Sequence, residues 1–98
     1  MADNTHESIN PPYEMKLLDS ENVAIIEENL VRFVEMKRLG ASTMEVNIAD
    51  ITEVETLPGD EGDMVIIRRK RGNSMRIGPL DSEVAAAGHA LLNRLIAD

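Results

Sequence analysis

Apolar and polar residues alternate along the middle of the chain, which is the pattern of antiparallel strands with one face buried. Met44, Val46 and Ile48 alternate with polar residues, so a half-buried strand is predicted at 43–48. A second run rich in β-branched residues predicts another strand at 51–57. The centre of the chain is therefore predicted to be an antiparallel meander.

The clearest hairpin signal of this meander follows at residues 64–77. Runs of strand-forming residues at 64–71 and 74–77 flank the pair Gly72-Asn73. Glycine accepts the positive φ of a primed two-residue turn without steric cost, and asparagine tolerates it better than most residues. A tight turn at Gly72-Asn73 is therefore predicted.

Near the C-terminus the apolar period changes from two residues to three or four. This spacing predicts an amphipathic helix at 82–97, with Asp81 or Ser82 as its N-cap. The small residues Ala87 and Gly88 lie on the apolar face and would allow a close approach to a sheet. The apolar face comprises Val84, Ala87, Gly88, Leu91 and Leu95.

Residues 20–39 allow two interpretations. The spacing of apolar residues, with Ser20 as N-cap and Gly40 after the end, fits a helix. The abundance of β-branched residues instead favours two strands, with Asn29 supplying a positive φ at the turn between them. The strand interpretation is favoured, and the helix stays as the alternative.

Together these patterns predict a mainly β domain at 13–98, a β-barrel or pair of orthogonal sheets with one C-terminal helix. The alternative is an α+β fold with an N-terminal helix, a four-stranded antiparallel sheet and the same C-terminal helix. Residues 1–12 are polar, contain Pro11-Pro12 and are predicted to be a disordered tail. The predicted strands are 15–18, 23–27, 30–38, 43–48, 51–57, 64–71 and 74–78.

Composition excludes several classes of function. The 98 residues have a net charge of −8, which repels phosphate backbones, so no nucleic-acid partner is expected. No apolar run approaches the ~18 residues that cross a bilayer, and the N-terminus lacks a secretory signal. There is no cysteine. A cytoplasmic protein without a transmembrane segment is predicted.

The sequence also contains no recognisable catalytic or metal-binding set of residues. His6 lies in the predicted tail and His89 is predicted to face solvent, so no set of histidine ligands forms. No nucleophile is paired with a base, and no glycine-rich phosphate loop occurs. We therefore predict a protein that is not an enzyme and uses no cofactor.

Five of the ten basic residues gather in the predicted hairpin at 68–76. Without their five positive charges, the net charge of −8 becomes −13 on the rest of the chain. Two interpretations follow. The cluster is a solvated hairpin tip, or it binds an anion, an acidic partner or an acidic face of a second copy, such as Glu53 and Glu55. The candidate binding residues are Arg68, Arg69, Lys70, Arg71 and Arg76.

Short strands followed by one amphipathic helix give the element order of pleckstrin-homology-like (PH-like) domains. The segment 44–55, in which an apolar strand leads into an acidic residue and a Val-containing strand, resembles bacterial members of that family. The resemblance implies two curved sheets with the helix plugging one open end, through Val84, Leu91 and Leu95. It also implies a small scaffold, often self-associating, without a known catalytic role.

Relatives of this family that bind lipid headgroups use basic residues in the first hairpin loop, whereas the matching loop here is Glu27-Glu28-Asn29. Lipid headgroup binding is therefore not expected. The resulting hypothesis is a non-enzymatic interaction or scaffold module that forms a homo-oligomer or binds a protein partner. The alternative is a small anion- or ligand-binding domain that uses the basic hairpin 68–76.

Overall fold

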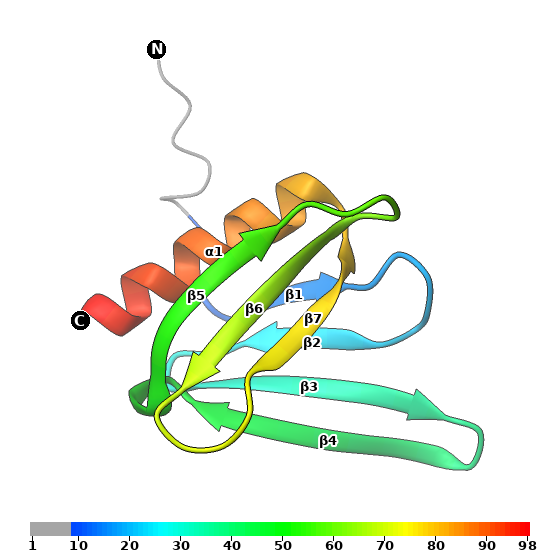
Figure 1. The fold of residues 1–98 in the computed structure, drawn as a ribbon. Coiled ribbons are helices and arrows are strands. Elements are labelled where there is room, and N and C mark those ends of the chain that lie inside the picture. Colours follow the sequence, from blue (N-terminus) through cyan, green and yellow to red (C-terminus); the bar gives the residue numbers. More distant parts are fainter. Residues whose placement is uncertain (1–8) are drawn as a thin grey trace.

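The computed structural model describes residues 9–98, which form two antiparallel sheets and one long helix (Figure 1). One sheet has the order β1-β2-β3-β4 and the other the order β5-β6-β7. The elements are β1 (Tyr13–Lys16), β2 (Val23–Ile26), β3 (Leu30–Lys37), β4 (Gly40–Asn47), the 3₁₀ turn η1 (Ile48–Asp50), β5 (Ile51–Leu57), β6 (Asp63–Arg69), β7 (Met75–Leu80) and α1 (Ser82–Ala97).

The strand interpretation of residues 20–39 is confirmed, and the alternative with an N-terminal helix is wrong. β2 and β3 pair antiparallel, with Ala24 opposite Phe33 and Ile26 opposite Val31. Ala24, Ile26 and Val31 enter the core, while Ile25 is half-buried on the outer face of the same sheet. Because apolar side chains occupy both faces of these strands, their spacing imitates that of a helix.

The mainly β class with one C-terminal helix is confirmed, but the sheets do not close into a barrel within residues 9–98. Strands β5–β7 cross over β1–β4, and the sheets are joined through η1. At the opposite corner, a single backbone hydrogen bond runs from Leu18 N to the Pro79 carbonyl (2.9 Å). An arrangement of this kind leaves four sheet edges, on β1, β4, β5 and β7.

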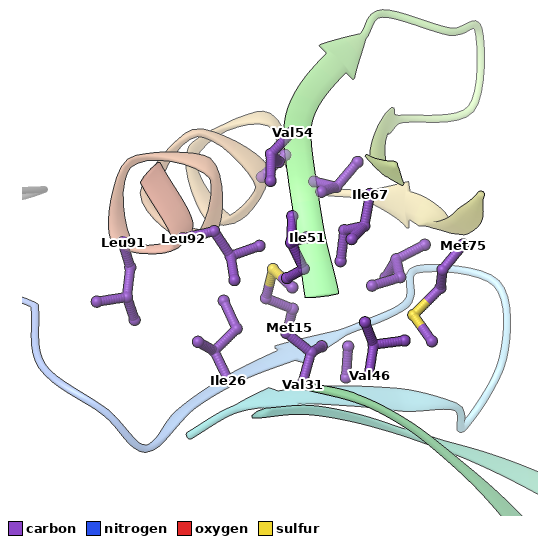
Figure 2. Packing of buried hydrophobic residues seen from close by; sticks show 14 of the residues in the cluster. Met15, Ile26, Val31, Val46, Ile51, Val54, Ile67, Met75, Leu91 and Leu92 are labelled. Carbon is purple, nitrogen blue, oxygen red and sulfur yellow. The ribbon is translucent and has the colours of Figure 1, made fainter. Parts of the chain in front are cut away.

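The hydrophobic core lies between the inner faces of the two sheets and the helix (Figure 2). Leu91 and Leu92 of α1 face Met15 and Ile26 of the first sheet, and all four side chains are fully buried. Leu91 is buried in this core, and Val84 and Leu95 are partly buried against it. Further core side chains are Val31, Val46, Ile51, Val54, Val65, Ile67, Ile77 and Leu80.

The helix begins as the sequence predicts. The carboxylate of Asp81 accepts hydrogen bonds from the amides of Glu83 (3.1 Å) and Val84 (3.4 Å), which identifies Asp81 as the N-cap. Gly88, one turn after Val84, packs against the side chain of Met15. The two are so close that a Cβ on Gly88 would overlap the Met15 sulfur. The glycine therefore sets the approach of α1 to β1.

Two predicted turns differ from the structure. The hairpin at 64–77 is confirmed, because β6 and β7 pair antiparallel. Its two-residue turn at Gly72-Asn73 is wrong, because β6 ends at Arg69 and β7 begins at Met75, which leaves a longer loop at 70–74. Only the glycine of that pair has a positive φ (+89°). The positive φ expected at Asn29 is also wrong, since every positive-φ residue in 9–98 is a glycine.

Residues 1–8 of the predicted tail lie outside the described residues. Ile9 packs against the core, and Arg94 Nη2 donates hydrogen bonds to the Ile9 carbonyl (2.6 Å) and to Asn10 Oδ1 (3.2 Å). The chain is thus in contact with α1 before β1 begins at Tyr13. No helix in residues 9–98 is long and apolar enough to cross a membrane.

Replacing Gly88 by valine is expected to lower the free energy of unfolding by about 1–3 kcal/mol, because Met15 is fully buried and has little room to move. Ala86→Val, at an exposed position of the same helix, is the matched control and should cost less than about 1 kcal/mol. Urea unfolding followed by circular dichroism measures both. Equal losses would show that Gly88 does not limit the helix–sheet distance.

Tyr13 gives the fold a predictable response to alkaline pH. Its pKa is raised, first by burial and then by the negative charge of Asp81, and its hydroxyl donates to the Val84 carbonyl (3.4 Å). Because the folded state holds this proton more tightly than the unfolded chain, the stabilisation is complete below about pH 10 and is lost as the pH rises through the folded pKa.

We therefore expect the unfolding free energy of the wild type to fall more steeply above about pH 10 than that of Tyr13→Phe. Tyr13 is the only tyrosine and tryptophan is absent, so the tyrosinate absorbance titrates this one group. A titration midpoint at or below that of a tyrosine model peptide would contradict the expectation.

Candidate functional site

The five basic residues predicted to form a site do not converge. Arg68 lies on the outer face of β6, where its Nε is 3.0 Å from Glu55 Oε2 and 3.9 Å from Glu53 Oε1. The hydrogen bond that Arg68 donates to Glu55, together with the negative charges of Glu55 and Glu53, raises the pKa of Arg68. The acidic pair predicted to receive a basic tip from another copy is thus already bound by Arg68 of the same chain.

Arg69 points to the other face of β6 and fixes the loop that follows. Its Nε lies 3.6 Å from Asp50 Oδ2, and its Nη1 donates a long hydrogen bond to the Asn73 carbonyl (3.5 Å). The amide of Lys70 donates to the Asp50 carbonyl (2.8 Å). These contacts tie loop 70–74 to η1, which explains why the tight turn at Gly72-Asn73 does not form.

The other three basic residues lie at two separate places. Lys70 and Arg71 are exposed beside a shallow depression that Arg69 and Asp50 also line. Arg76 is exposed on β7 and borders a different depression of about 260 Å³, whose walls include Phe33 and Met44. Within residues 9–98, none of these three cations forms an ion pair within 4.0 Å. Three of the five candidates, Arg69, Lys70 and Arg71, thus line one depression, which neither Arg68 nor Arg76 borders.

The β3–β4 hairpin is a more prominent feature that the sequence did not mark as a site. It extends past the ends of the other strands (Figure 1), and every residue from 35 to 45 is exposed. We call residues 35–45 the arm. Three apolar side chains are unusually accessible there: Leu39 at the tip is 98% exposed, Met36 51% and Met44 52%.

At the base of the arm, Arg32 lies between two carboxylates. Its Nε donates to Glu45 Oε2 (3.0 Å), and its Nη1 contacts Glu27 Oε2. The hydrogen bond to Glu45 and the charge of Glu27 raise the pKa of Arg32. Glu45 is the only charged residue of β4, and its ion pair with Arg32 lowers, without removing, the repulsion between Glu45 and a strand that approaches this edge.

The hydrogen-bond pattern shows which backbone groups of β4 face outward. The amide of Ile48 donates to the Asn29 carbonyl (2.9 Å), and the register places this pair in the same ladder as β3 and β4. In an antiparallel ladder hydrogen-bonded pairs recur at every second residue, so the even-numbered residues of β4 bond to β3. The N–H and C=O groups of Ala41, Thr43 and Glu45 therefore point away from the sheet.

The edges of β1 and β7 are blunted. β1 has four residues, its outward positions Glu14 and Lys16 are charged, and the edge ends where Leu18 N bonds to Pro79. β7 carries an irregular register and Pro79 itself, which has no N–H to offer a new strand. Short length, charge, bulges and proline are the usual ways in which proteins protect sheet edges.

The edge of β5 is covered by the helix. His89 Nε2 lies 3.0 Å from the carbonyl oxygen of Val54 on β5, and 3.2 Å from Nδ2 of Asn93 one turn further along the helix. The prediction that His89 faces solvent is wrong, because the ring contacts the backbone of β5, a strand that is distant in the sequence. His89 instead satisfies an outward carbonyl of an edge strand.

β4 is the remaining edge, and it has none of these protections. Its register with β3 is unbroken from Gly40 to Asn47, it contains no proline, and it is the terminal strand of its sheet. The strand alternation of β4 was predicted, but its first three residues were assigned to a turn. The absence of proline and lysine from 40–47, together with Met36 and Leu39 next to the turn, was the available signal.

No family model, curated protein or solved structure matches this chain. The resemblance to PH-like domains accordingly stays a prediction. Residues 9–98 also contain no cluster of three or more His, Cys, Asp or Glu side chains arranged to hold a metal ion. The unprotected edge of β4, with the apolar side chains of the arm, is the candidate functional site.

In dilute solution, we expect the amides of Thr43 and Glu45 to exchange with solvent faster than those of Met44 and Val46, because only the latter two bond to β3. The amide of Met36 donates to Asn22 Oδ1 (2.8 Å) and serves as a protected reference in the arm. Hydrogen exchange followed by NMR measures all five. Equal protection of Thr43 and Met44 at micromolar concentration would show that the edge of β4 is already covered.

Proposed function

We propose that this chain is a non-enzymatic interaction module that binds protein by adding a strand to the edge of β4, and that it self-associates through this edge. The observation that carries the proposal is the outward backbone of Ala41, Thr43 and Glu45, on the one sheet edge of residues 9–98 that carries no protection. Unpaired N–H and C=O groups in a row form a template for another strand.

The apolar side chains of the arm support the same function. Met36, Leu39 and Met44 add nothing to the core, and they surround the edge to which a strand would bind. Strand addition supplies main-chain hydrogen bonds, and such side chains supply the apolar contact that gives affinity and specificity. The unpaired backbone of β4 and the exposed apolar side chains of the arm are unfavourable in an isolated chain, and both become favourable in a complex.

Binding of small anions by the basic hairpin 68–76 finds less support. Arg68 is engaged by Glu53 and Glu55, and Arg69 by Asp50. The depression lined by Arg69, Lys70 and Arg71 is open to solvent and also contains the carboxylate of Asp50, which Arg69 already contacts. The local geometry fits a loop held by ion pairs better than an anion site.

Thr43→Pro tests the proposed function. Proline removes an outward N–H that β3 does not use, so the variant should keep the fold and lose the association. Thr43→Val keeps the amide and the β-branched shape, and it should associate like the wild type. Light scattering coupled to size exclusion, from micromolar to millimolar protein, measures the mass of each, with far-UV circular dichroism as the check on folding.

Each outcome has a distinct meaning. Association of the wild type and Thr43→Val, but not of folded Thr43→Pro, is the expected result. A wild type that remains monomeric at millimolar concentration would overturn self-association. Association that Thr43→Pro leaves unchanged would place the interface elsewhere and end the proposal for β4.

A further inference from the structure

We infer that the strand added to β4 is the β4 of a second copy, antiparallel about a two-fold axis at Thr43, with Leu39 of each copy seated in a depression at the base of the other copy's arm. This inference rests on the proposed function, since it names the partner of the same edge. It specifies a closed dimer rather than an open chain of strands.

The backbone pattern restricts how two β4 strands can pair. Hydrogen bonds form only when outward residues face outward residues, so odd-numbered positions of one copy must face odd-numbered positions of the other. An axis at Thr43 pairs residues 40–46 of both copies, and an axis at Met44 pairs residues 41–47. Axes nearer to either end of β4 leave more of the edge unpaired.

Charge distinguishes these two registers. With the axis at Met44, the Glu45 side chains of the two copies become diagonal neighbours about 7–8 Å apart or less, and like charges at such positions destabilise a sheet. With the axis at Thr43, each Glu45 faces Ala41 of the other copy. The Thr43 register is therefore favoured.

The same register brings the tip of one arm to the base of the other. Leu39 of one copy would lie level with Asn47 of the other, where a depression of about 610 Å³ opens between η1 and the end of α1. We call it the terminal depression. Its walls include Ile48, Leu95 and Ile96, which offer apolar contact to a leucine side chain that is otherwise 98% exposed.

The charges around this contact are complementary. Lys37 and Arg38 directly precede Leu39 at the tip. Among the described residues, the charged side chains that border the terminal depression are Glu28, Asp98 and Lys70. A parallel pair would instead bring the two basic tips side by side, where they repel each other. Complementary charge thus favours the antiparallel arrangement and a second copy as the partner.

Cysteine scanning of β4 tests the arrangement directly, because the natural chain has no cysteine. Single variants at residues 41–45 are oxidised in solution at a concentration where the wild type associates. Residues that face each other across an antiparallel pair have Cα atoms about 5.5 Å apart, within the range of a disulfide, whereas residues displaced by several positions exceed it.

We expect Thr43→Cys to cross-link at least about tenfold faster than Ala41→Cys or Glu45→Cys. A mixture of the last two should give a cross-linked heterodimer, since these positions face each other in the Thr43 register. Glu61→Cys, in an exposed loop remote from the arm, is the control for random collision. Fastest cross-linking at residue 42 or 44, or a rate at Thr43 no higher than at Glu61, would overturn the register.

Leu39→Ser tests the second contact. Because Leu39 is almost fully exposed, this change should leave the fold intact and weaken dimerisation by about tenfold or more. Unchanged dimerisation would overturn the seating of Leu39 in the terminal depression.

These results separate the inference from the function on which it rests. Association that Thr43→Pro abolishes, combined with the wrong cross-linking pattern, ends the two-fold arrangement but keeps strand addition. A monomeric wild type ends both.

Discussion

At the edge of every open sheet, alternate backbone N–H and C=O groups have no partner inside the sheet. Such an edge is either protected against another strand or left open to one, and this chain contains both kinds of edge. Because the two sheets of residues 9–98 do not close into a barrel, these residues have four sheet edges. β1 is short and charged, β7 carries Pro79 and an irregular register, and β5 is capped by His89 of the helix. The edge of β4 has none of these features and is therefore open to another strand.

Sequence patterns predicted the elements well where the cause is local. The alternation in β4 and β5, the N-cap at Asp81 and the helical period of α1 all depend on neighbours in the chain, and all appear in the structure. Residues 20–39 were harder, because their strands carry apolar side chains on both faces. Periodicity alone cannot separate that arrangement from a helix.

Features that depend on distant residues were not predictable. The loop after β6 follows the contacts of Arg69 and Lys70 with Asp50, which lies in another element. Arg68 was predicted to form a site with its basic sequence neighbours, but the register of β5 and β6 places it within ion-pair distance of Glu55. The role of His89 required the position of β5. The candidate site itself is an unprotected edge, so its only signal in the sequence is the lack of proline and lysine at 40–47.

The arm is separated from the packed core, and this has a consequence for how such a protein can diverge. Side chains at 35–45 are exposed, whereas the residues that hold the sheets and helix together lie elsewhere. Substitutions in the arm therefore leave the folding free energy nearly unchanged, since exposed positions tolerate replacement. Selection can rewrite the binding specificity of one hairpin while the rest of the domain stays fixed, so descendants of one stable scaffold can acquire different partners through very few mutations.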